Sequence, residues 1–226
     1  MSAGRTFAAL AAALIGAACS SEGPQDLDRI AALAKQSLLP AETAAPVREL
    51  TRAELDQIPY ATIALSLGGG PRSFIVPLAD NGGYLTYQDA NRRGLVMLGG
   101  AVTGTLALGG DLRTVQHDRH DPVAYPQPLA DWPGRVFRDY QFKARDGAEY
   151  RITLDCMFQT VAAETVEIVE IAFDLVRVSE ICTNAARQVT NTYWVEADTG
   201  FIWKSEQWLG PRLGQATIEI IRPYGG

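Results

Sequence analysis

The stretch that decides the fold reads NTYWVEADTGFIWKSEQW and runs from Asn191 to Trp208. Two runs rich in β-branched and aromatic residues, 191–196 and 201–208, flank a short polar turn that ends in a glycine. This pattern is typical of a β-hairpin. Side chains alternate along a strand, so Trp203 and Trp208 are expected on opposite faces of the sheet.

The hairpin also supplies the candidate binding surface. Tyrosine and tryptophan are suited to partly solvated surfaces, because each ring has an apolar body and one polar atom. Four rings are candidates for contact with a partner protein or a sugar: Tyr193, Trp194, Trp203 and Trp208. The alternative is that the rings fill the core and form cross-strand pairs, which is the commoner outcome for any single ring.

Outward from the hairpin, further short runs have strand composition and are separated by glycine, asparagine and proline. They cover residues 61–67, 73–78, 84–87, 136–143, 149–157, 166–178 and 217–221. Glycine pairs such as Gly99-Gly100 read as turns or bulges. No long helices alternate with these strands, which argues against a parallel α/β sheet. We therefore predict a mainly antiparallel β domain, either barrel-like or a sandwich.

Helices are expected only near the N-terminus. Apolar residues at helical spacing predict one helix over 26–39. A second, brief helix is indicated by Thr51 and Glu54, which form a capping box, and by Leu50 and Leu55, which can form a hydrophobic staple around it. Farther along, 118–133 is rich in proline and is expected to be an irregular loop.

The first residues have the layout of an export signal. Arg5 precedes an apolar run over 7–18, and Cys19 follows directly. The segment before Cys19 resembles the lipobox of bacterial lipoproteins, although Gly16 stands where a large aliphatic residue is usual. We predict a signal peptide at 1–18, lipid attachment (palmitate) at Cys19, a tether at 19–25 and one domain at 26–226. The alternative is a secreted protein cut near Ala18. Ser20 after the cysteine implies sorting to the outer membrane.

Two further cysteines remain, Cys156 and Cys182. An exported chain meets an oxidising compartment, and an even number of cysteines favours one disulfide. The alternative is two buried free thiols. Neither cysteine has a cysteine or histidine neighbour at zinc-ligand spacing, so no zinc site is expected.

Other functional classes find little support. The net charge is −6 and no cluster of basic residues occurs, which argues against nucleic acid as a partner. Both histidines, His117 and His120, lie in the acidic segment HDRHD, which could bind a metal or move protons. A solvated polar loop is the simpler interpretation. Scattered carboxylates (Glu149, Asp155, Asp198 and Glu206) could serve a glycosidase only if two face each other across a cleft. We expect no cofactor, no metal and no catalytic residue.

The sequence resembles the YjbF/GfcB lipoproteins of group 4 capsule and exopolysaccharide export. The resembling residues are those of the hairpin together with Gly210-Pro211; upstream, 50–52, Ile58-Pro59, Asn81-Gly82, Thr86-Tyr87 and 106–112 support it. The resemblance implies a mainly β fold and a periplasm-facing accessory protein at the outer membrane. It also implies companions from the same export system, an outer-membrane β-barrel protein and a periplasmic protein. It implies no catalytic residue.

Overall fold

The structure is a computed structural model that describes residues 50–109, 111–144 and 146–225. The predicted signal peptide, the tether with Cys19 and the helix over 26–39 lie outside the described residues. Among the described residues, the chain forms one twelve-stranded sheet in which every ladder is antiparallel. The predicted fold class, mainly antiparallel β, is therefore confirmed.

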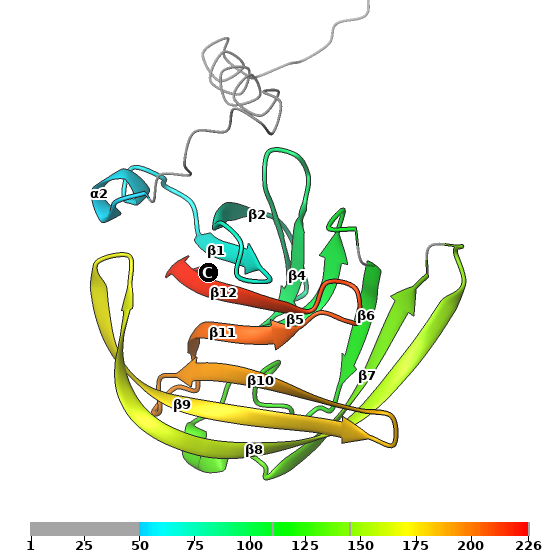
Figure 1. The fold of residues 1–226 in the computed structure, drawn as a ribbon. Helices are drawn as coiled ribbons and strands as arrows, with labels where there is room; N and C mark the ends of the chain where they lie inside the picture. Colours follow the sequence, from blue (N-terminus) through cyan, green and yellow to red (C-terminus); the bar gives the residue numbers. More distant parts are fainter. Residues whose placement is uncertain (1–49, 110, 145, 226) are drawn as a thin grey trace, which may run out of the picture. The chain divides into compact units, whose positions relative to one another are not determined.

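The strands follow one another with short connections. Their bounds are β1 Thr62–Leu67, β2 Ser73–Asn81, β3 Tyr84–Gln88, β4 Gly94–Leu98, β5 Ala101–Leu106, β6 Asp111–His117, β7 Arg135–Lys143, β8 Glu149–Ile168, β9 Ile171–Asn184, β10 Arg187–Val195, β11 Ile202–Trp208 and β12 Gln215–Arg222. The order across the sheet is β5-β4-β3-β2-β1-β12-β11-β10-β9-β8-β7-β6. The first and last strands of the chain thus pair in the middle, and the sheet curls until its two edges approach (Figure 1).

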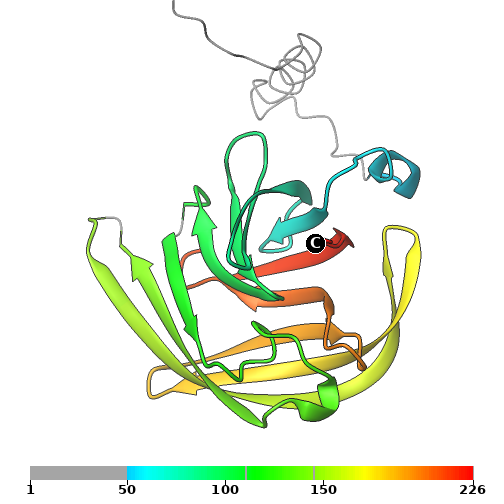
Figure 2. The ribbon, with the colours of Figure 1, turned by 180° about the vertical axis from the view of Figure 1, so that it is seen from behind.

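The curled sheet is a nearly closed barrel, which decides between the two predicted architectures. The edge strands β5 and β6 meet through a side chain, because Leu112 N donates to Thr105 Oγ1 at 3.1 Å. Gly104 lies against the same strand, where a Cβ would sit 3.4 Å from Arg113 O. Seen from behind, the two edges lie side by side (Figure 2). A side-chain contact therefore marks the seam of the barrel.

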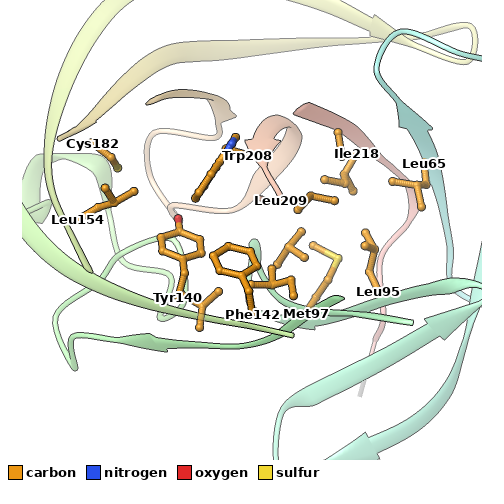
Figure 3. Close-up of a cluster of buried hydrophobic side chains, with 14 of the residues drawn as sticks. Leu65, Leu95, Met97, Tyr140, Phe142, Leu154, Cys182, Trp208, Leu209 and Ile218 are labelled. Carbon is orange, nitrogen blue, oxygen red and sulfur yellow. The ribbon is translucent and has the colours of Figure 1, made fainter. Parts of the chain in front are cut away.

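The barrel interior is filled by inward-facing side chains from most of the strands. Figure 3 shows part of this cluster, with Tyr140, Phe142 and Trp208 packed among aliphatic residues that include Leu154, Leu209 and Ile218. Aromatic contacts join the rings, since Trp208 lies edge-on to Tyr140 at 5.3 Å and to Phe142 at 5.7 Å between centroids. Full burial of each large apolar side chain contributes about 1.5–3 kcal/mol. The barrel is consequently held together by a packed core.

A smaller cluster lies outside the barrel wall. The short helix α2 (Arg52–Leu55) buries Leu55 there, together with Ala64 of β1, Ile168 of β8 and Ile221 of β12. The predicted capping box is confirmed, since Glu54 N donates to Thr51 Oγ1 at 3.4 Å and Thr51 N donates to Glu54 Oε2 at 2.9 Å. The cluster ties the start of the domain to the tip of the β8–β9 hairpin.

The long β8–β9 hairpin corrects one sequence prediction. Residues 166–178 were expected to form one strand, whereas the chain reverses at Val169 and Glu170, whose φ angles are 43° and 66°. Tight hairpin turns with positive φ normally carry glycine or asparagine. A β-branched valine at such a turn gives no local signal, so composition alone continues the strand through it.

Candidate functional site

The aromatic hairpin lies largely in the core. Tyr193 is 0% exposed, Trp194 9% and Trp208 8%, while Trp203 is half-buried. Three of the four rings therefore follow the alternative in which the rings are buried, and partner or sugar contact by the hairpin stays a prediction. The physical reason is that Tyr193 and Trp208 pack into the interior clusters, while the outward ring of Trp194 is covered by Lys204 and bonded to Glu164. Only Trp203 keeps substantial exposure, and it stacks on Phe173 with ring centroids 4.2 Å apart.

A β-bulge explains how the rings are distributed. The register between β10 and β11 shifts where Trp194 pairs with Lys204 and Val195 pairs with Ile202. Ile202 and Ser205 are both buried inside, so the two residues between them turn outward together. Strict alternation along β11 would put Trp203 on the same face as Ser205, and the bulge prevents this. Trp203 instead joins the outer cluster, while Trp208 joins the main core.

A buried polar cluster crosses the barrel interior. Arg138 of β7 forms a double ion pair with Asp121, with Nε to Oδ2 at 2.7 Å and Nη2 to Oδ1 at 2.8 Å. Its third nitrogen, Nη1, contacts Glu180 Oε2 at 2.6 Å. Tyr193 Oη and Asn191 Nδ2 donate to the same carboxylate oxygen at 2.8 and 2.7 Å. One guanidinium and two carboxylates are therefore held together in the buried interior.

The electrostatics of this cluster favour its charged form. Burial alone would raise the pKa of Asp121, but the Arg138 charge and hydrogen bonds from His117 and Arg138 outweigh burial and hold that pKa well below its usual range. Burial raises the pKa of Tyr140 to about 12 and that of Tyr193 well above its ordinary value. Asp121 thus stays ionised and the tyrosines stay protonated at neutral pH.

Sequence reasoning missed this cluster, yet a signal for it exists. Val136, Tyr140 and Phe142 share the inward face of β7, and Arg138 lies among them at the same alternating positions. A charged residue within an apolar face has to find a partner in the interior. The partner, Glu180, lies between inward residues Val178 and Cys182 of β9 in the same way.

The histidine segment divides between interior and solvent. The His117 side chain is 4% exposed and its Nδ1 lies 2.7 Å from Asp121 Oδ2, whereas the His120 side chain is 74% exposed and contacts Asp118 at 3.2 Å. The two imidazoles therefore do not share a site. The expected solvated loop holds for His120, while His117 and Asp121 are drawn inward by Arg138.

The proline-rich loop that follows packs against the hairpin turn, and residues 118–134 form no strand, as predicted. Leu129 N, in the short 3-10 helix η2 (Leu129–Asp131), donates to Ala197 O at 2.8 Å, and Gly100 N donates to Val123 O at 2.8 Å. Gly200 has φ 73°, and a Cβ there would lie 1.9 Å from Gln127 O. The glycine of the hairpin turn is thus required by the loop that covers it.

The structure contains the Cys156–Cys182 disulfide, in agreement with the sequence prediction. The two residues face each other directly across β8 and β9, with Cα atoms 3.9 Å apart. Glu180 lies close by, and its carboxylate and the two sulfurs fall within 4.8 Å of one another. Because the sulfurs are joined, they offer no thiolates, and these three residues form no metal site in the disulfide state.

An open polar groove lies on the outer face of β1, β12 and β11. Its volume is about 290 Å³, and it is lined by charged and hydroxyl side chains with a glycine–proline turn at one end: Ala64, Ser66, Gly70, Pro71, Arg72, Lys204, Glu206, Thr217 and Glu219. Glu219 is the centre of its charges, because Oε2 pairs with Arg72 Nε at 3.3 Å and Oε1 with Lys204 Nζ at 3.1 Å. Lys204 also lies over the ring of Trp194.

Within the described residues, no helix is long and apolar enough to cross a membrane. The fold and site therefore define a class: an antiparallel barrel with a filled interior, a sealed ionic cluster and polar side chains outside. Residues 11–221 match the family model described as "Group 4 capsule polysaccharide lipoprotein gfcB, YjbF", so the chain belongs to this family.

Two curated relatives come from Escherichia coli (strain K12). The chain is 25% identical to "Uncharacterized lipoprotein GfcB" over 177 residues, 75% of this chain and 79% of the relative. It is 29% identical to "Uncharacterized lipoprotein YjbF" over 183 residues, 78% of this chain and 82% of the relative.

A solved structure has the same fold. The crystal structure of the hypothetical lipoprotein YmcC from Escherichia coli (K12) matches with a TM-score of 0.70 and 22% sequence identity. The match covers 92% of this chain and all of that one. At this identity the likeness shows the fold alone.

Proposed function

We propose that this protein is a non-catalytic accessory factor in capsule or exopolysaccharide secretion, anchored by lipid at Cys19 to the outer membrane and facing the periplasm. It acts by binding partner proteins or the polymer. The partners we propose are an outer-membrane β-barrel protein and a periplasmic protein of the same export system. Membership of the capsule lipoprotein family supports the pathway, and the observation that supports binding is the contrast between a sealed interior and an open polar outer face.

The alternative, a polysaccharide-modifying enzyme, needs two carboxylates that face each other in an open site. Asp121 and Glu180 form the interior carboxylate pair, and both are buried and bound to Arg138. On the outer face, Glu206 and Glu219 line the groove, but Glu219 is committed to two ion pairs. Asp155, another candidate, pairs with Arg135 on the surface, and the hydrogen bond from Arg135 lowers the pKa of that carboxyl. These arrangements favour binding over acid–base chemistry.

The anchor and the pathway can be tested together in cells. The gene is deleted and then restored as wild type or as Cys19→Ala, and surface polysaccharide is measured beside labelling with a palmitate analogue. We expect the deletion to lose surface polysaccharide, the wild type to restore it and take up label in the outer-membrane fraction, and Cys19→Ala to remain unlabelled. Normal secretion in the deletion would contradict the pathway, and equal labelling of both proteins would contradict the anchor. Depolymerisation of the host's polysaccharide by the purified protein would replace binding with enzymatic turnover.

A further inference from the structure

Six outward-facing polar side chains lie in one line across the barrel wall. The strand registers pair Ser66 with Thr217, Thr217 with Glu206, and Glu206 with Thr192. They continue from Thr192 to Ser179 and from Ser179 to Gln159. We call these six residues, one each from β1, β12, β11, β10, β9 and β8, the transverse row. All six are at least partly exposed.

The row offers hydrogen-bonding groups that the protein itself does not use. Among the described residues, Ser66 Oγ donates to Gly70 O at 2.6 Å, while the side chains of the other five members have no hydrogen-bond or ion-pair partner. Three hydroxyls, one carboxylate and one amide are consequently available to a ligand. One end of the row, at Ser66, Thr217 and Glu206, lies in the 290 Å³ groove, so the surface is hollowed there.

The spacing of the row suits a repeating ligand. Neighbouring strands lie about 4.8 Å apart, so six strands present five steps over roughly 24 Å. One step is close to the length of a hexose unit in an extended chain. Side chains that can both donate and accept match sugar hydroxyls, which do the same. A linear polysaccharide laid across the strands would therefore meet one polar side chain per sugar.

Charge and apolar content decide between possible occupants. Three basic side chains flank the row, and each contacts a carboxylate: Arg72 and Lys204 contact Glu219, and Arg177 contacts Glu164. With Glu206 the local sum is three positive and three negative charges, which favours a neutral stretch of polymer over a strongly acidic one. The row itself contains no large apolar side chain, whereas the centre of a protein–protein interface is usually apolar and aromatic.

We propose that the transverse row is the polysaccharide-binding surface of this protein and that it holds a neutral, hydroxyl-rich segment of the chain by hydrogen bonds. This inference rests on the proposed function and assigns a site and a ligand chemistry to it. Trp194 contributes indirectly: Lys204 lies over its ring and Glu164 accepts a hydrogen bond from its Nε1, so the buried ring fixes two charged side chains beside the row.

The test removes two hydroxyls from the row without changing shape. Full-length protein in detergent is run through native gels that contain polysaccharide purified from the bacterium that produces the protein. We expect the wild type to be retarded and the double variant Thr192→Val, Thr217→Val to bind roughly thirtyfold more weakly, because two lost hydrogen bonds of about 1 kcal/mol each amount to about 2 kcal/mol, and about 1.4 kcal/mol corresponds to a tenfold change. The matched control is Thr114→Val, Thr183→Val, which removes two outward hydroxyls of β6 and β9 that lie off the row and have no hydrogen-bond partner among the described residues.

The control pair should bind as the wild type does. The proposal is overturned if the wild type is not retarded, if the row pair binds as well as the wild type, or if the control pair loses as much affinity as the row pair. These results are distinct from failure of the proposed function, which is decided by secretion in the deletion strain. The deletion strain could lose secretion while the purified protein shows no binding to the polymer. That combination would exclude this site and leave partner binding as the mode of action.

Discussion

Polar side chains on the interior face of the barrel bind one another, whereas those on the outer face are left to solvent, although the same strands supply both sets. Glu180 faces inward and Ser179 outward; one step along the sheet, Asn191 faces inward and Thr192 outward. Inside, the polar groups bind one another, since Asn191 and Tyr193 both donate to Glu180. Outside, the hydroxyls of Ser179 and Thr192 have no side-chain partner among the described residues.

This difference separates the polar residues of the wall into those that stabilise the fold and those that are available for binding. A buried charge without a partner costs several kcal/mol, so the interior cluster has to be internally complete. A solvated hydroxyl without a protein partner costs almost nothing, because water replaces the partner. Among the described residues, four buried polar atoms have no hydrogen-bond partner: His117 Nε2 and Glu180 Oε1 in the interior, and Arg177 Nε and Trp203 Nε1 on the outer side of the wall. Substitutions inside should therefore affect stability, and substitutions outside should affect binding.

The largest effect is expected for the interior cation. Arg138→Met leaves Asp121 and Glu180 buried without their common partner, which should lower the free energy of unfolding by about 3–5 kcal/mol. Urea denaturation of the purified protein measures the loss. Arg135→Met is the matched control on the same strand, because Arg135 pairs with Asp155 on the surface. It should leave the free energy of unfolding nearly unchanged, because water and salt screen this exposed pair. Similar losses for both variants would mean that the interior cluster is no more important than a surface pair.

The disulfide comes next. Its loop spans 26 residues, for which the chain-entropy model gives about 3.5 kcal/mol of stabilisation. Cys156→Ala with Cys182→Ala should lower the free energy of unfolding by that order. Alkylation of the unfolded, unreduced wild type provides the check: neither cysteine should react, and modification of both would show that the bridge is absent.

A smaller effect should appear at alkaline pH. Burial raises the pKa of Tyr87 to about 12, while an unfolded tyrosine ionises near 10. Because its pKa is raised in the folded state, protonated Tyr87 stabilises the fold fully below pH 10. This stabilisation is lost as the pH rises from 10 through 12. The wild type should lose stability between pH 9 and pH 11, and we expect Tyr87→Phe to reduce this loss in the free energy of unfolding by about 1 kcal/mol, measured from the change in urea midpoint. An unchanged pH profile would show that Tyr87 is not protected by burial.

The smallest effect on stability is expected from the transverse row. Thr192→Val with Thr217→Val should change the free energy of unfolding by less than about 0.5 kcal/mol, because both side chains face solvent and valine suits a strand. Thermal unfolding beside the gel assay gives the comparison. A stability loss of several kcal/mol would place these hydroxyls among the structural groups of the wall and would remove the difference between its two faces.

Much of the fold could be predicted from local pattern. The β-rich runs, the capping box of Thr51 and Glu54 and the loop after His117 are set by neighbours in sequence, which composition and spacing reveal. The strands β4, β5 and β6 were not delimited, and the β8–β9 turn was missed. In that turn, Val169 and Glu170 adopt positive φ without glycine or asparagine, so tertiary pairing of β8 with β9 overrides local preference.

By itself, the sequence determined the fold class, most of the strands, the family resemblance and the pair Cys156 and Cys182, because each depends on residue type and spacing along the chain; the export signal stays a prediction from the same kind of pattern. Only the tertiary structure decided which side of the wall each residue faces. One bulge between β10 and β11 turned Trp203 outward, and barrel closure brought Asp121 to Arg138 across 17 residues and Glu180 to Arg138 across 42. Contacts between distant segments depend on register and closure, which no local pattern in one sequence encodes.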